Sequence, residues 1–327
     1  MRAWLAALLA LAAPLLASAD EKPPLTFERS IALPKVRGRI DHLAIDAARQ
    51  RLFVAALGND TVEVVDLEKG EVALELGGFS EPQDVLFLAP LDRLFVSNGG
   101  TGVVDMLDGE RFERIGRVEL SADADNIRYD AATNRVYVGY GEGALAILDG
   151  ASGRPVGDIA FTGHPESFQL ESSGTRVFVN VPDAHAIVVL DRGEAAQVAA
   201  WRIERGVANF PMALDEVDHR LVVGFRLPAV LRLYDTASGA ELGSLGSCKD
   251  ADDIFLDAAR HRVYVSCGEG VVDVLRLDGD RLMRLARVAT AAGARTSLFV
   301  AERGILYVAV PRRGSQAAEV RVYRAAP

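Results

Sequence analysis

Arg51-Leu52-Phe53-Val54 is the first copy of a short pattern that recurs along the chain and decides its fold. The pattern is a basic or polar residue, an apolar residue, an aromatic residue and a valine. Further copies, two of them weaker, are Arg93-Leu94-Phe95-Val96, Arg135-Val136-Tyr137-Val138, Arg176-Val177-Phe178-Val179, Arg220-Leu221-Val222-Val223, Arg262-Val263-Tyr264-Val265 and Ile305-Leu306-Tyr307-Val308. The second positions are separated by 42, 42, 41, 44, 42 and 43 residues. A fixed period of this size indicates one small sheet per repeat.

Each unit reads as four short antiparallel strands, named A to D in chain order. In the first unit they are residues 42–46, 51–55, 61–66 and 71–76, separated by polar turns rich in Gly, Asn and Asp. Runs of β-branched and aromatic residues between such turns are typical of strands. Seven units predict an all-β, seven-bladed β-propeller with four-stranded blades. A parallel β-helix is the competing interpretation, but it has shorter rungs and lacks hairpin turns.

The last unit lacks a strand D. Its strands A, B and C are predicted near residues 297–300, 305–310 and 319–323, whereas residues 26–33 near the N-terminus form a spare strand. We expect this N-terminal strand to complete the last blade, because that closes the ring and hides its edges.

Residues 1–19 have the features of a secretory signal peptide. A positive start at Arg2 precedes an apolar run from Trp4 to Leu16, and an A-x-A cleavage site ends at Ala19. The run is short for a membrane span, although an uncleaved anchor is the alternative. We therefore expect one propeller domain, residues 20–327, in the periplasm or secreted, and a monomer. The net charge of −10 opposes binding of nucleic acid.

Polar residues that differ from blade to blade precede or begin the A strands. These strands surround the central channel, so their first residues should meet at one mouth together with the B–C turns. The predicted ligand-binding residues are Asp41, His42, Asp84, Asp125, Asn126, His164, Glu166, Asn209, Phe210, Asp252, Asp253, Arg295 and Thr296. The B–C turns on the same face include Tyr140, Glu142, Asp183, His185, Arg226, Glu269, Arg312 and Arg313.

Three interpretations of this mouth stay open. Carboxylates suit Ca²⁺ or another divalent cation, and two histidines widen the choice of metal; the candidate metal ligands are His42, His164, Asp125, Glu166 and Asp252. A metal-free site for a small molecule or peptide is the second interpretation. In the third, the side chains only cap strands in a wet channel. Arg295 could neutralise the acids or bind a substrate anion.

Cys248 and Cys267 flank strands A and B of the sixth unit, so hairpin geometry places them at the same end of the sheet. In an oxidising compartment this favours a disulfide. Two free thiols, or a soft-metal pair with His42 or His164, are the alternatives. The chain has no C-x-x-C-H motif and no Walker loop, so neither covalent haem nor a nucleotide is predicted.

The B strands, and the turns that run from Asp130 to Arg135 and from Asp257 to Arg262, resemble the YVTN-type propeller repeats of YncE-like periplasmic proteins. The resemblance covers nearly the whole chain after residue 19 and implies the propeller fold. It leaves activity open, because related propellers include DNA-binding, surface-layer, lactonase-like and lyase-like members. The absence of a G-H…W-D signature disfavours WD40 repeats.

Three functions are compatible with these features. The first is an exported binding or scaffold protein, without turnover, that presents an acidic mouth to a small molecule, a cation or a protein. The second is a metal-assisted lactonase or lyase in which His42 or His164 moves a proton. The third is binding of single-stranded DNA, with Phe210, Tyr140 and Phe225 as stacking platforms, although the charge of the ring opposes it.

Overall fold

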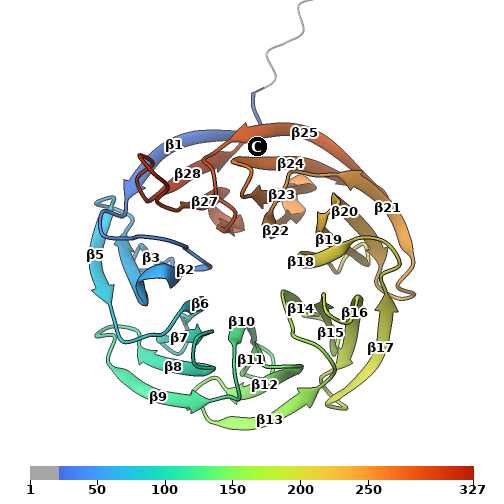
Figure 1. The fold of residues 1–327 in the computed structure, drawn as a ribbon, viewed down its shortest axis with the longest axis horizontal. Coiled ribbons are helices and arrows are strands. Elements are labelled where there is room, and N and C mark those ends of the chain that lie inside the picture. Colours follow the sequence, from blue (N-terminus) through green and yellow to red (C-terminus); the bar gives the residue numbers. More distant parts are fainter. Residues whose placement is uncertain (1–21) are drawn as a thin grey trace, which may run out of the picture.

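A computed structural model describes residues 22–327 as seven four-stranded antiparallel sheets around a central axis (Figure 1). This confirms the predicted seven-bladed β-propeller. The proposed signal peptide, residues 1–19, lies outside the described residues. Within residues 22–327, none of the helical segments has the length and apolar character that a membrane crossing requires.

The blades follow one another along the chain, with strand A innermost and strand D at the rim. Blades one to four are β2 (Leu43–Asp46), β3 (Arg51–Ala56), β4 (Thr61–Asp66) and β5 (Glu71–Leu76); β6 (Pro82–Leu88), β7 (Arg93–Asn98), β8 (Val103–Asp108) and β9 (Arg114–Glu119); β10 (Ala124–Asp130), β11 (Arg135–Tyr140), β12 (Ala144–Asp149) and β13 (Pro155–Ala160); β14 (Phe168–Leu170), β15 (Arg176–Val181), β16 (Ala186–Asp191) and β17 (Ala196–Arg202).

The remaining blades repeat this order. They are β18 (Val207–Asp215), β19 (Arg220–Leu227), β20 (Ala229–Asp235) and β21 (Glu241–Gly246); β22 (Ala251–Asp257), β23 (Arg262–Cys267), β24 (Val271–Asp278) and β25 (Arg281–Ala289); and β26 (Ser297–Val300), β27 (Ile305–Val310) and β28 (Glu319–Ala325) with β1 (Leu25–Ala32). Three short 3₁₀ turns are η1 (Leu57–Asn59), η2 (Ala258–Arg260) and η3 (Ala301–Arg303).

The recurring pattern forms the central strands because both of its faces are buried. In β3, Leu52 and Val54 pack in a cluster shared with the last blade, whereas Phe53 and Ala55 pack in a cluster shared with the second blade. Successive side chains of a strand point to opposite faces of the sheet. An uninterrupted apolar run is therefore what a strand between two neighbouring blades requires.

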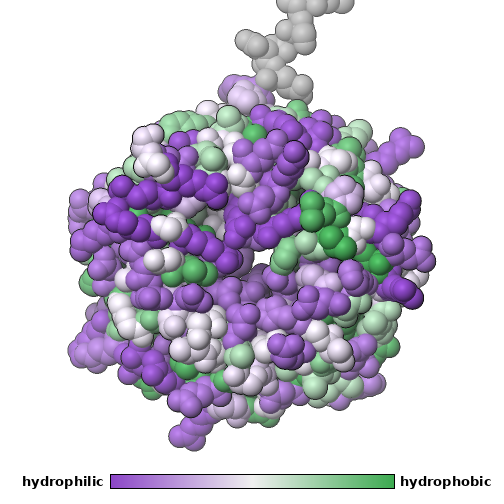
Figure 2. Space-filling view, in the orientation of Figure 1, coloured by the Kyte–Doolittle hydropathy of each residue, from purple (hydrophilic) through white to green (hydrophobic). Residues whose placement is uncertain are grey.

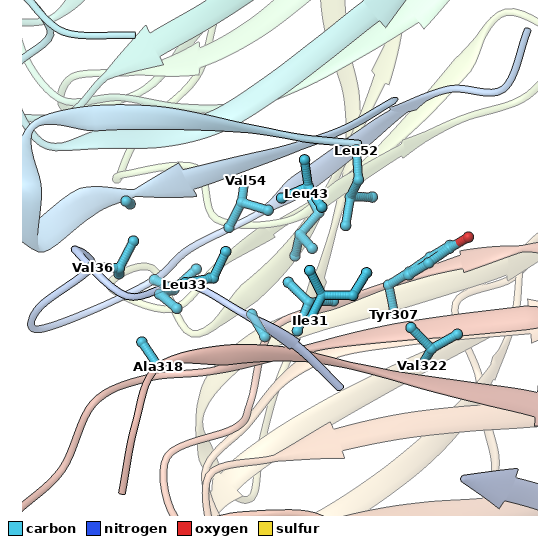
Figure 3. Packing of buried hydrophobic residues seen from close by; sticks show 14 of the residues in the cluster. Ile31, Leu33, Val36, Leu43, Leu52, Val54, Tyr307, Ala318 and Val322 are labelled. Atoms are coloured by element: carbon cyan, nitrogen blue, oxygen red, sulfur yellow. The ribbon is translucent and has the colours of Figure 1, made fainter. Parts of the chain in front are cut away.

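Strand β1 closes the ring, as the sequence predicts. It pairs antiparallel with β28, and the order of the last sheet is β1-β28-β27-β26. Figure 3 shows Ile31 and Leu33 packed between the last and first blades. The alternation expected over residues 26–33 is interrupted by a β-bulge between Phe27 and Arg29. Phe27 is consequently 52% exposed, whereas Ile31 is fully buried.

Candidate functional site

Equivalent residues of the seven A strands can be assigned from the sheet registers. In each blade one A-strand residue pairs with the valine that ends the recurring pattern; the pairs are Leu43↔Val54, Val85↔Val96, Ile127↔Val138, Phe168↔Val179, Met212↔Val223, Ile254↔Val265 and Ser297↔Val308. The residues two positions earlier form what we call the inner ring: Asp41, Gln83, Asp125, Glu166, Phe210, Asp252 and Arg295. All seven line one cavity of about 420 Å³ at the mouth of the channel.

An outer layer of the same cavity was not predicted. Arg39, Glu81, Asp123 and His164 each lie two positions before an inner-ring residue and also line the cavity; of these only His164 was predicted. Alternate residues of an extended chain share a face, so this spacing was the signal that could have identified the other three. Arg226, predicted in the B–C turn of the fifth blade, lies instead near the end of β19 and also lines the cavity. Figure 2 shows hydrophilic side chains around the central opening.

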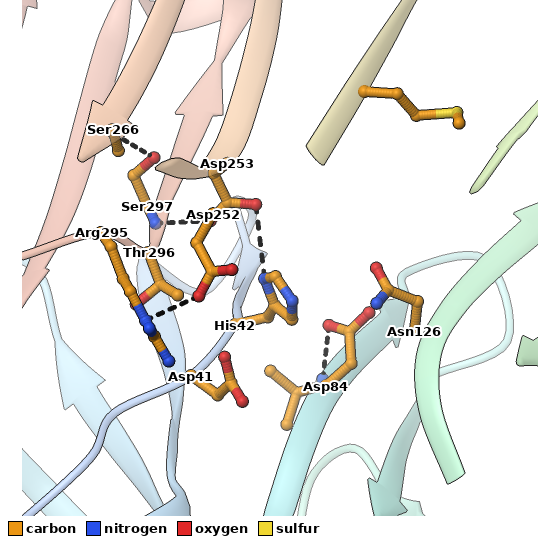
Figure 4. A network of polar contacts seen from close by, with 12 residues as sticks. Asp41, His42, Asp84, Asn126, Asp252, Asp253, Ser266, Arg295, Thr296 and Ser297 are labelled. Carbon is orange, nitrogen blue, oxygen red and sulfur yellow. Dashed lines mark hydrogen bonds and ion pairs between the residues drawn. The ribbon is translucent and has the colours of Figure 1, made fainter. Parts of the chain in front are cut away.

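The residues one position farther along the chain form what we call the waist ring: His42, Asp84, Asn126, Ser167, Pro211, Asp253 and Thr296. Figure 4 shows His42 between Asp84 and Asp253, with Nδ1 of His42 3.4 Å from Oδ1 of Asp253. Burial opposes the charged imidazolium, but the carboxylates of Asp253, Asp84 and Asp41 outweigh it and raise the pKa of His42 well above its usual value.

Two predicted ligand-binding acids of the waist ring are used to join blades. Oδ2 of Asp84 accepts a hydrogen bond from the backbone N–H of Ile127 at 2.9 Å and forms an ion pair with Arg128 at 3.1 Å. Oδ2 of Asp253 accepts the equivalent bond from the N–H of Ser297 at 2.7 Å. Each carboxylate thus binds the backbone of the next blade, which leaves it less free to bind a ligand.

Two further predicted site residues do not line the mouth cavity. A β-bulge between Asn209 and Met212 places Phe210 in the inner ring, so Asn209 precedes it and is buried. The side-chain amide of Asn209 donates to Oδ1 of Asn180 at 3.1 Å and to the carbonyl of Ala186 at 3.2 Å. The hydroxyl of Thr296 donates to the carbonyl of Ile40 at 3.4 Å.

On one side of the cavity, every arginine faces an acid. Arg226 donates to Oδ1 of Asp252, and Nε of Arg295 lies 2.8 Å from Oδ2 of the same carboxylate. Arg39 lies 2.8 Å from Asp41. The guanidinium of Arg226 also covers the ring of Phe210, 4.1 Å from its centroid. Arg295 therefore neutralises acids of the mouth.

Asp41 and Asp125 of the inner ring are buried. Asp41 faces Arg39 through its Oδ2, whereas no ion pair within the described residues involves Asp125. Asp41 is 1% exposed, and its Oδ1 has no hydrogen-bond partner in the described part of the chain. Asp125 is 6% exposed, and the nearby cationic groups are the imidazoles of His42 and His164. Burial raises the pKa of Asp41 to about 7, that of Asp125 to about 6 and that of Glu166 to about 9, where Asp125 and Asp252 add repulsion.

The candidate metal ligands do not form a coordination shell. Within residues 22–327, no three His, Cys, Asp or Glu side chains are placed to hold a metal ion. Both histidines have other partners: His42 faces Asp253, whereas Nδ1 of His164 lies 2.7 Å from the carbonyl of Gly141.

The three aromatic residues considered for stacking on DNA bases do not form a platform. Phe225 is only 1% exposed, because it packs between the fourth and fifth blades. The ring of Phe210 is covered by Arg226, and the hydroxyl of Tyr140 donates to Asp158 at 2.9 Å. The stacking role predicted for Phe225 is therefore wrong.

Cys248 and Cys267 form a disulfide in the sixth blade, with Cα atoms 5.9 Å apart. The chain between Cys248 and β22 carries Asp250, which lies 3.1 Å from Arg295 and 3.5 Å from Arg226. The disulfide thus anchors the segment whose Asp250 contacts Arg226 and Arg295.

Comparison with known proteins supports the fold and no more. No family model and no curated protein matches this chain. Among solved structures, a chain of "Crystal Structure of Mitotic Checkpoint Complex" superimposes with a TM-score of 0.78 at 15% identity, covering 98% of this chain and 99% of that one. The chains of "Crystal structure of RRP9 WD40 repeats" and "Structure of U3-55K" also give 0.78, at 11% and 10% identity, and cover 91% and 90% of this chain and 97% and 98% of their own.

Proposed function

We propose that this protein is an exported binding protein whose channel mouth holds a small polar molecule with a positively charged nitrogen. The observation that carries the proposal is the burial of Asp41 and Asp125 in the wall of the mouth cavity. Oδ2 of Asp41 faces Arg39, but its Oδ1 has no hydrogen bond within the described chain. A cavity of about 420 Å³ falls in the range of small-molecule sites.

A cationic ligand would relieve the cost of this arrangement. Burying a carboxylate without a partner is unfavourable, and the group responds by holding its proton. An ammonium group in the cavity would favour the ionised carboxylates, so binding would release protons and become tighter as the pH rises from 5 to 8. A neutral molecule of the same shape would gain nothing from these acids.

Isothermal titration calorimetry with n-butylamine and n-butanol at pH 8 tests the proposal. We expect butylamine to bind, butanol not to bind, and Asp125→Asn to weaken butylamine binding by about tenfold, which corresponds to about 1.4 kcal/mol. Asp92→Asn is the control, because Asp92 pairs with Arg49 outside the mouth. Equal affinity for butylamine and butanol, or no binding of either, would overturn the proposal.

Export is the second part of the proposal. It rests on the sequence of residues 1–19 and is supported by the disulfide between Cys248 and Cys267, because such bonds persist in oxidising compartments. Intact-mass analysis of protein recovered from the periplasmic or culture fraction should show a chain that begins at Asp20. A chain that retains residues 1–19 in the cytoplasmic fraction would contradict export.

A protein partner on the same face is a second candidate. Val207 and Leu227 pair across β18 and β19 and are 40% and 66% exposed, and Figure 2 shows a hydrophobic patch beside the opening where these strands lie. One of the similar propellers occurs in a structure titled as a complex. If this patch binds a protein, Leu227→Glu should abolish its capture and leave butylamine binding unchanged.

A further inference from the structure

We propose that the ligand is a linear diamine, with one ammonium group at the inner-ring acids and the other at Glu81 and Asp123. This inference rests on the proposed function and specifies its ligand. It starts from the distribution of charge in the cavity wall, which is not uniform around the ring.

The acids of the cavity divide into two sets. Asp41 and Asp252 face the three arginines that line the cavity, Arg39, Arg226 and Arg295. The second set comes from the second, third and fourth blades: Glu81, Asp123, Asp125 and Glu166. No arginine or lysine from these three blades lines the cavity. Two ammonium groups balance more of the charge of this second set than one does.

The second set is arranged in two layers. Asp125 is buried in the inner ring, whereas Asp123 lies two residues earlier with its side chain 48% exposed. Their Cα atoms are at most roughly 7 Å apart, the span of two fully extended residues, and both side chains line the same cavity. An extended diamine with four or five methylene groups has its nitrogen atoms at a similar separation.

The outer acids retain the capacity to bind an ammonium group. Oδ1 of Asp123 accepts a hydrogen bond from the side-chain amide of Gln83 at 2.7 Å, and its Oδ2 lies 3.6 Å from Nε2 of His164. A carboxylate offers about four acceptor positions, so these contacts orient Asp123 without saturating it. Glu81 is exposed beside them and adds a second carboxylate.

The groups that titrate around this site set the conditions of a test. The imidazolium of His42, whose pKa is raised, competes with a ligand for the acids, His164 lies beside Asp123, and the acids themselves lose charge at low pH. Arg226 lies near Glu166 on the opposite side. At pH 8 the carboxylates of Asp41 and Asp125 are mostly ionised, whereas Glu166 still holds its proton, and low ionic strength keeps the screening small.

The experiment compares n-butylamine with 1,4-diaminobutane by calorimetry on the full protein. In the unmodified protein we expect the diamine to bind roughly fivefold or more tightly, which is the scale of one partly exposed ion pair. Asp123→Asn and Glu81→Gln should each weaken binding of the diamine more than binding of butylamine and so reduce this preference. Asp125→Asn should weaken both ligands.

The outcomes separate the two proposals. If butylamine binds but the diamine binds no more tightly, or if the preference survives both Asp123→Asn and Glu81→Gln, the inference is overturned and the proposed function stands. If neither amine binds, the proposed function fails as well. Circular dichroism and thermal unfolding of each variant verify that it is folded, and the exposed positions of Glu81 and Asp123 make loss of folding unexpected.

Discussion

The role of a residue at the channel mouth depends on its position within strand A. Inner-ring side chains line the cavity, whereas waist-ring acids bind the next blade. Asp84 and Asp253 occupy the same position in the second and sixth blades and accept the same backbone hydrogen bond, from Ile127 and from Ser297. A carboxylate in this position therefore acts first as a connection between blades.

Removal of this connection should destabilise the ring. We expect Asp84→Ala to lower the free energy of unfolding by about 2–3 kcal/mol, because it leaves the buried N–H of Ile127 and the charge of Arg128 without their acceptor. Asn126→Ala is the matched control from the same ring. The side-chain Oδ1 of Asn126 accepts a hydrogen bond from Arg128 in the same strand and none from the next blade. Urea unfolding measures both, and equal losses would contradict the role of Asp84.

The buried acids should make stability depend on pH. The pKa of Asp125 is raised to about 6 from 3.8 and that of Glu166 to about 9 from 4.5, so the folded chain holds protons that the unfolded chain releases. Stability is then highest below about pH 4 for these groups and is lost as the pH rises through 6 and 9. The raised pKa of His42 acts in the same direction.

Asp125→Asn should therefore be more stable than the unmodified protein at pH 8, by on the order of 1–3 kcal/mol, and should show no gain at pH 4. Urea unfolding at the two pH values measures the difference. An equal loss of stability at both pH values would contradict the expectation, because it would show that ionisation of Asp125 does not destabilise the folded chain.

The sequence predicted the fold better than the site. Seven copies of one apolar pattern determine seven sheets, because both faces of each B strand must be buried. Nine of the thirteen predicted ligand-binding residues line the mouth cavity. The displacement of Asn209 depends on a β-bulge, and the roles of Asp84 and Asp253 depend on contacts with a neighbouring blade. Neither feature is visible in the periodicity of one strand.

At the scale of the element, β1 joins the two ends of the ring. It contributes Ile31 and Leu33 to the cluster between the last and first blades and pairs with β28 over most of its length. A strand in this position holds the last blade together with residues from both ends of the chain.

Ile31→Ala should cost about 2–5 kcal/mol, the range for a fully buried isoleucine. Phe27→Ala in the same strand is the matched control, because Phe27 is half exposed beside the bulge. Thermal and urea unfolding should show a much smaller effect for Phe27→Ala. Similar losses for both variants would mean that β1 acts only through its backbone.

At the scale of the whole molecule, the two ends of the described chain meet. The N–H of Ala326 donates to the carbonyl of Pro24 at 3.0 Å, and Figure 1 shows β1 alongside β28. The ring can therefore be opened elsewhere and joined here.

Two circular permutants test whether a blade built from both ends of the chain stabilises the ring more than contacts between complete blades do. Both join residue 327 to residue 22. One opens in the turn between β4 and β5, so the first blade is again built from both ends; the other opens between β5 and β6, so every blade is continuous. We expect the first to unfold at a urea concentration close to that of the parent, and the second at a lower one. Equal midpoints would show that the shared blade adds nothing.

The inner ring takes one side chain from each blade, and these side chains lie outside the apolar clusters that build the sheets. The cavity lining and the apolar cores of the blades thus use different positions of the same repeat. Substitution of the seven inner-ring residues could therefore change what the mouth binds while the apolar clusters between the blades stay the same. This makes the propeller a suitable starting scaffold for engineered receptors.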